Sequence, residues 1–210
     1  KRIILVALCI GGFSLCQAQK INLGKAASAV SKGAQALAFS NEDAKKLSKE
    51  SVEWMDKNNP VTDSKSPYTK RLNRLFGKHK SEDGLDLNYK VYHVVDINAF
   101  ACADGSVRVF SSLMDLMTDD ELLAIIGHEI GHVKNEDTKD AVKSAYMRAA
   151  AQDAAGATSG AVRALSNTEL GEMANAMLEA KHSKKQESQA DEYAYNFMKK
   201  HGYDVVAVYT

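Results

Sequence analysis

Residues 118–134 read TDDELLAIIGHEIGHVK, and this stretch decides how the rest of the chain is interpreted. Thr118 is followed three residues later by Glu121, a capping box in which each side chain satisfies a free amide at a helix start. Apolar residues then recur at helical intervals along one broad side: Leu122, Leu123, Ile125, Ile126, Ile130 and Val133. The stretch therefore predicts a helix that begins near residue 119 and packs in a hydrophobic core.

The same helix carries a metal-binding pattern. His128 and His132 are four residues apart, so their rings project from one face and can bind a single ion. Glu129 follows the first histidine, which places its carboxylate beside the ion, where it can take a proton from a water molecule. We expect His128 and His132 to be ligands of a catalytic zinc ion and Glu129 to be the general base.

A second pair of carboxylates supplies the third ligand. Glu187 and Asp191 are also four residues apart, at the start of a helix capped by Ser183 and Gln186. We predict that Glu187 binds the metal. Asp191 would accept a hydrogen bond from the other ring nitrogen of a liganding histidine, with His128 as the first choice. Two imidazoles and a carboxylate suit zinc better than other divalent ions.

Other interpretations of the histidines stay open. The pair in the motif could be core histidines satisfied by hydrogen bonds, or part of a closed structural zinc site. His182 could approach the metal, although an isolated histidine at a helix start is more commonly solvated. The histidines at positions His79, His93 and His201 have no partner pattern, so we expect them to be structural or exposed.

The N-terminal residues predict export. Lys1 and Arg2 precede an apolar run that is shorter than the ~20 residues needed to span a bilayer. We expect residues 1–18 to be a signal peptide cleaved after Ala18 and the mature protein to be periplasmic. The alternative is lipidation of Cys16, which would anchor the chain to a cell-envelope membrane.

The remaining sequence predicts a mainly helical α+β fold. Residues 89–96 and 107–110 are rich in β-branched and aromatic residues, and Asp104-Gly105 suits a type I′ turn. We therefore expect a small antiparallel sheet. Cys102 is the only thiol outside the predicted leader and is interpreted as a small strand residue rather than a nucleophile.

Composition divides the rest of the chain. Residues 19–60 are rich in Ala, Lys and Glu and predict an N-terminal helical segment, whereas residues 61–210 hold the metal-binding pattern and form the predicted metallopeptidase domain. Small residues dominate 141–165, which predicts a mobile insert. Lys plus Arg equals Asp plus Glu at 27 each, so bulk charge attracts neither nucleic acid nor anionic lipid.

These motifs, in this order, resemble the HtpX-like zinc peptidase family, and its soluble periplasmic branch above all. The similar stretches are residues 96–101, the turn at Gly105, residues 121–133 and residues 187–191. The resemblance implies a zincin-type gluzincin domain with one zinc ion per chain. It also implies endopeptidase action on proteins, including misassembled envelope proteins.

The resemblance adds a substrate-binding edge strand, which would comprise Asn98, Ala99, Phe100 and Ala101. A peptide that adds to such an edge is held by main-chain hydrogen bonds with little demand on sequence. Ordinary sheet packing with Phe100 in the core is compatible with this role. The residue that stabilises the oxyanion is unassigned.

Hydrolysis of protein or peptide substrates is the first functional hypothesis. The alternative is a metal-containing peptide-binding or chaperone-like module of the cell envelope, in which the edge strand captures clients and the metal is structural or covered by the insert. A third hypothesis is an envelope scaffold built on the Ala-rich and Lys-rich helix of residues 24–57.

Overall fold

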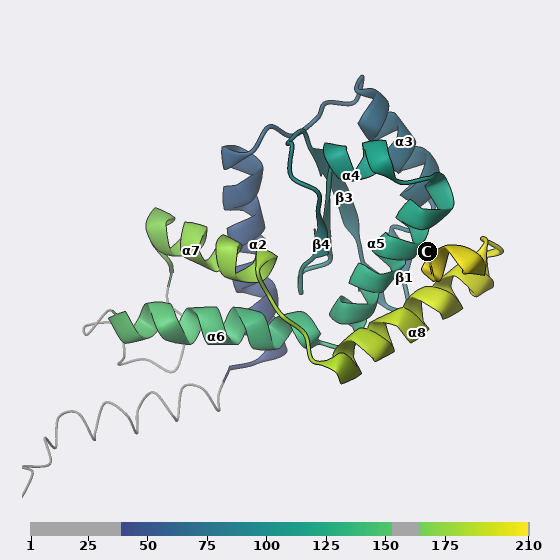
Figure 1. The fold of residues 1–210 in the computed structure, drawn as a ribbon. Helices are drawn as coiled ribbons and strands as arrows, with labels where there is room; N and C mark the ends of the chain where they lie inside the picture. The colour runs from purple at the N-terminus through teal and green to yellow at the C-terminus, as the bar shows by residue number, and fades with distance from the viewer. Residues whose placement is uncertain (1–38, 153–163, 210) are drawn as a thin grey trace, which may run out of the picture.

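The computed structural model describes residues 39–152 and 164–209. Within them, a three-stranded sheet lies between two groups of helices (Figure 1). The helices on one side are α2 (Asn41–Asn58), α6 (Asp137–Gln152) and α7 (Asn167–Leu178). Those on the other are α3 (Pro67–Phe76), α4 (Ser111–Leu116), α5 (Asp119–Lys134) and α8 (Lys184–His201), which the short helix η1 (Val205–Val208) follows. The predicted α+β class with a mainly helical chain is confirmed.

Capping residues decide where these helices begin. The capping boxes at Thr118 and Ser183 form as predicted and start α5 and α8. A third box at Ser40 starts α2, and Gly202, at a φ of 72°, ends α8. Part of the predicted insert was misread, because residues up to Gln152 continue α6. The predicted leader, Cys16 and the centre of the insert lie outside the described residues.

The sheet is mixed rather than antiparallel throughout, which corrects the prediction. β4 (Ala99–Ala101) pairs antiparallel with β5 (Ser106–Phe110), but β3 (Asn88–Tyr92) pairs parallel with β5. Residues 93–98 cross the end of β5 and place β3 and β4 on its two sides, so β5 is inserted between two strands that run in opposite directions. A separate hairpin of β1 (Ser81–Glu82) and β2 (Leu85–Asp86) is antiparallel.

The turn between β4 and β5 also differs in type from the prediction. The Gly105 N–H donates to the Cys102 carbonyl, and Gly105 has a φ of 83°. Asp104 does not have a positive φ, whereas a type I′ turn requires one at both central residues. Because the Cys102 N–H also donates to the Ser106 carbonyl, three residues, 103–105, connect this closing pair, with the glycine in the left-handed position.

Alternate residues of the sheet face the two helix groups. Val107 and Val109 of β5 enter the core formed with α3, α5 and α8, whereas Phe110 packs on the α2 side. Cys102 is 1% exposed and packs on the α2 side as well, and burial raises the pKa of its thiol. These contacts fit the interpretation of Cys102 as a packing residue.

A buried ion pair joins α2 to the centre of the sheet. Arg108 of β5 is 2% exposed, and its Nε and Nη2 atoms donate to the two carboxylate oxygens of Asp56 at 2.8 and 3.0 Å. Burial by itself would raise the pKa of Asp56, but hydrogen bonds from Arg108, Lys90 and Tyr92 outweigh it and lower this pKa to about 2. The pair fixes α2 against the sheet.

Candidate metal centre

α5 and α8 pack closely along the faces that carry the predicted ligands. A Cβ atom added to Gly131 would lie 3.0 Å from the Ala190 Cα atom and 3.0 Å from the Tyr193 Cβ atom. At Gly127 the nearest atom would be Phe197 Cδ1, at 3.1 Å. The two glycines therefore let the helix backbones approach each other, which brings Glu187, the predicted ligand on α8, to the histidines of α5.

The three predicted ligands come together in space, and we call them the N-terminal cluster because Glu187 lies in the first turn of α8. The Nε2 atoms of His128 and His132 are 3.0 Å apart. The Glu187 carboxylate lies 3.4 Å from His128 Nε2 and 3.9 Å from His132 Nε2. One donor atom from each residue thus lies within 4.8 Å of the others, as a shared ion requires.

Both histidines are oriented by a carboxylate behind the ring. His128 Nδ1 lies 2.9 Å from Asp191 Oδ1, as predicted, and His132 Nδ1 lies 2.9 Å from Asp137 Oδ2. A neutral imidazole that donates from Nδ1 to such a carboxylate offers the lone pair of Nε2 to a metal ion. Two such nitrogens 3.0 Å apart, beside a third carboxylate, are a donor set that fits a divalent metal ion.

Asp137 is a site residue that the sequence reasoning missed. It is 7% exposed at the start of α6, and its other oxygen accepts a hydrogen bond from Gln186 at 3.0 Å. The chain reaches it through Glu136, which has a φ of 62°. The sequence signal for Asp137 is an acidic residue just beyond the helix that carries the histidines. Helical spacing cannot relate it to His132, because Asp137 lies past the end of that helix.

Glu129 lies beside the cluster and faces β4. Its carboxylate accepts a hydrogen bond from the Ala101 N–H. Burial, and then repulsion by the Glu187 carboxylate, raise the pKa of Glu129 to about 8. A carboxyl group with a raised pKa and a position next to a metal centre can both accept and return a proton near neutral pH.

The predicted substrate strand is the edge of the sheet nearest this cluster. The Cys102 N–H donates to Ser106, and the Phe110 N–H donates to Asn98, so residues 98 and 102 point their main-chain groups toward β5. Ala99 and Ala101 therefore point theirs toward the open edge. This edge lines a pocket of about 220 Å³ together with the ligands and Glu129. Phe100 also lines the pocket, and it packs in the core on the α2 side.

His182 also lines this pocket. Its ring stacks on that of His132, with centroids 3.9 Å apart and an interplanar angle of 17°. The residue is half-buried rather than fully solvated. Burial, and then the neighbouring His132, lower the pKa of His182. The structure therefore brings a third imidazole to the cluster.

Comparison with known proteins agrees with this geometry. Residues 70–210 match the model of peptidase family M48. The chain belongs to peptidase family M48. It is 40% identical over 169 residues to the metalloprotease YcaL of Escherichia coli K12, covering 80% of this chain and 66% of that protein. It is 35% identical over 202 residues to the metalloprotease LoiP of the same organism, covering 96% of this chain and 80% of that protein.

Similarity to the protease HtpX covers a shorter stretch of the chain. The HtpX of Actinobacillus pleuropneumoniae serotype 5b is 43% identical over 51 residues, which cover 22% of this chain and 18% of that protein. The resemblance noted from the motifs is thus confirmed, and so is the prediction of a metalloprotease. M48 membership also implies a metal ion. Across the described residues, no helix combines the length and apolar character needed to cross a membrane.

Proposed function

We propose that this M48 chain is a zinc endopeptidase whose metal is held by His128, His132 and Glu187. The observation that carries the proposal is the pair of imidazole Nε2 atoms 3.0 Å apart, each ring fixed from behind by a carboxylate, with a third carboxylate beside them. This set of two nitrogens and one oxygen is typical of catalytic zinc sites that keep a fourth position for water or substrate.

The protein residues divide the chemistry among them. Bound at this cluster, zinc would supply Lewis-acid chemistry, acidifying a water molecule and polarising a peptide carbonyl. Glu129 takes the proton of the attacking water and returns it to the nitrogen of the leaving amine. The Asp191 and Asp137 carboxylates keep the two imidazoles in the tautomer that offers Nε2 to the metal.

A protein substrate would bind as an added strand along β4. The main-chain groups of Ala99 and Ala101 that point away from β5 are suited to pair with an extended peptide next to Glu129. Part of the Ala101 main chain already binds Glu129, which couples the strand to the general base. Because such pairing uses the backbone, we expect little sequence preference, as suits a protease of unfolded or misassembled envelope proteins.

Export stays part of the proposal. Residues 1–18 would be removed as a signal peptide, leaving the helical segment 19–60 and the peptidase domain 61–210 in the periplasm. Lipidation of Cys16 is the alternative route to the envelope and would tether the peptidase to a membrane.

Two substitutions test the proposal against a pure binding module. Glu129→Gln should lower casein turnover by at least about 100-fold while the N-terminal cluster keeps its metal, because only proton transfer is lost. Glu187→Ala should remove both the metal of this cluster and turnover.

Glu192→Gln and Glu192→Ala are matched controls, since Glu192 is exposed on the same helix. Full turnover in Glu129→Gln would contradict the mechanism. A wild-type chain that binds peptide but does not cleave it would favour the binding module.

A further inference from the structure

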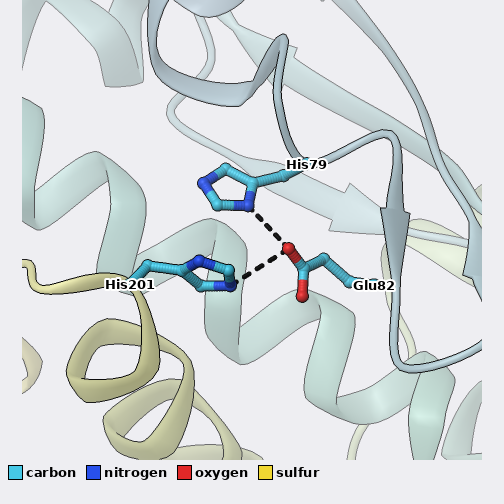
Figure 2. A group of neighbouring side chains, drawn as sticks. All are labelled: His79, Glu82 and His201. Carbon is cyan, nitrogen blue, oxygen red and sulfur yellow. Dashed lines mark hydrogen bonds and ion pairs between the residues drawn. The ribbon is translucent and has the colours of Figure 1, made fainter.

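A second group of two histidines and a glutamate lies at the other end of α8. His201 is the last residue of that helix, Glu82 lies in β1, and His79 lies in the connection between α3 and β1. We call them the C-terminal cluster. Figure 2 shows one carboxylate oxygen of Glu82 between the two rings. This oxygen is 2.7 Å from His79 Nδ1 and 3.0 Å from His201 Nε2. The three donor atoms lie within 4.8 Å of one another.

The cluster is largely buried. The side chains of His79 and Glu82 are 1% and 5% exposed, whereas that of His201 is 21% exposed. The Nε2 atom of His201 is itself buried, and the Glu82 oxygen lies 3.0 Å from it. A buried imidazole nitrogen next to a carboxylate oxygen can bind a divalent cation when the ring offers its lone pair.

Two of the remaining polar atoms, one on His79 and one on Glu82, have partners that would orient metal ligands. His79 Nε2 lies 2.7 Å from the Tyr203 hydroxyl, and the second oxygen of Glu82 accepts a hydrogen bond from Lys200 at 3.0 Å. Lys200 thus occupies one carboxylate oxygen and leaves the other for a metal. Liganding histidines generally bind a polar group through the ring nitrogen that does not hold the metal.

We propose that His79, Glu82 and His201 form a second divalent-metal site, structural in kind and best suited to zinc. Ligand bonds of about 2.0–2.2 Å require the donor atoms to move a few tenths of an ångström apart, which small side-chain rotations provide. The proton of His79 moves from Nδ1 to Nε2 on binding. The Tyr203 hydroxyl accommodates this change by turning from donor to acceptor. The partly exposed side chain of His201 would be the entry path for the ion.

Such a site would fix the helix that carries the catalytic ligand. His201 lies fourteen residues after Glu187, about 21 Å along α8. The ring of Phe197 packs on His79 with centroids 4.9 Å apart and lies against Gly127 of α5. A metal at the C-terminal cluster would therefore hold α8 against both the β1 hairpin and α5. This position stabilises the packing that brings Glu187 to His128 and His132.

Metal counting on the full chain tests the site independently of activity. After exposure to excess zinc and desalting, mass spectrometry should find two ions in the wild type and one in Glu82→Gln and in His201→Gln. His93→Gln, which removes an exposed histidine outside both clusters, should keep two. Glu187→Ala should retain one ion, and the double variant Glu187→Ala/Glu82→Gln none. Two ions retained by Glu82→Gln, or a single wild-type ion lost in Glu187→Ala, would overturn the proposal.

A thermal measurement guards against a folding defect. In the Glu187→Ala chain, zinc at about a hundred times its dissociation constant should raise the melting temperature by roughly 5–10 °C. Adding Glu82→Gln, which preserves the side-chain shape, should abolish that increase without changing the circular dichroism spectrum. An equal increase in both chains would contradict a metal site at the C-terminal cluster.

Discussion

The two clusters at opposite ends of α8 offer the same donors in different surroundings. The N-terminal cluster opens into a pocket and has Glu129 beside it as an additional carboxylate. At the C-terminal cluster, Phe197 and Tyr203 pack around His79, and Lys200 pairs with both Glu82 and Asp83. Donor type by itself therefore does not decide the chemistry. The proposed catalytic centre differs from the proposed structural site in the additional carboxylate of Glu129 and in its open pocket.

The largest effect should come from separating the two helices at the N-terminal cluster. Gly131→Ala forces a Cβ atom to within 3.0 Å of the α8 backbone, so α8 must move and Glu187 with it. A displacement of a few tenths of an ångström is expected to lower casein turnover, by up to the roughly 100-fold that a misplacement of about 1 Å can cost. Gly171→Ala is the matched control, because its Cβ atom would lie at a similar 3.2 Å from the Trp54 ring, far from either cluster. Equal losses in both variants would mean that general destabilisation, rather than helix approach, is responsible.

Substituting the carboxylates that contact the Nδ1 atoms of the two histidines should weaken metal binding, and the more buried carboxylate should matter more. Asp137→Asn is expected to lower metal affinity at the N-terminal cluster by about 10–100-fold, because a buried charge then no longer fixes the His132 tautomer. Asp191 is 64% exposed, so Asp191→Asn should have a smaller effect. Competitive titration with a zinc chelator measures both. A larger loss in Asp191→Asn would contradict the ranking.

The pH dependence of unfolding tests the ion pair between Asp56 and Arg108, which lies outside both clusters and involves no metal. The pKa of Asp56 is about 2 in the folded protein, below the ordinary value of 3.8, so its ion pair with Arg108 stabilises the fold fully above about pH 4. The stabilisation is lost as the pH falls from about 4 to 2 and amounts to about 2 kcal/mol. Urea unfolding in chelator should show this loss in the wild type and not in Asp56→Asn. The exposed control Asp96→Asn should behave as the wild type.

The smallest effect is expected at Tyr203, and it tests whether the C-terminal cluster is a structural rather than a catalytic site. Tyr203→Phe removes the hydroxyl that holds His79 Nε2 at 2.7 Å and should weaken zinc binding there by about 10-fold. Turnover should stay within twofold of the wild type, because the active site is untouched. Tyr209→Phe is the control, since that tyrosine is 77% exposed. A large fall in turnover with zinc binding intact would show that Tyr203 acts on the active site instead.

Local patterns predicted the helices and the ligands that they carry. The capping boxes at Thr118 and Ser183 depend on residues three apart, and the candidate ligand pair His128 and His132 depends on residues four apart, so neighbouring positions contain the signal. The contact of His128 with Asp191 was predicted as well, because both helices could be placed beforehand. The parallel pairing of β3 was missed, since strand direction depends on how the chain crosses the sheet and not on strand composition.

The sequence by itself determined a core helix with two inward histidines, a neighbouring glutamate and a second helix with a matching carboxylate pair, because a helix converts spacing directly into direction. Only the tertiary structure decided that Asp137 holds His132 and that His79 meets Glu82 and His201. Asp137 lies past the end of the helix that carries His132, and His201 lies more than a hundred positions from His79 and Glu82. His79 and Glu82 are three positions apart but share no helix, so helical periodicity relates none of these side chains. The packing of α6, α8 and the β1 hairpin in the folded chain brings them together.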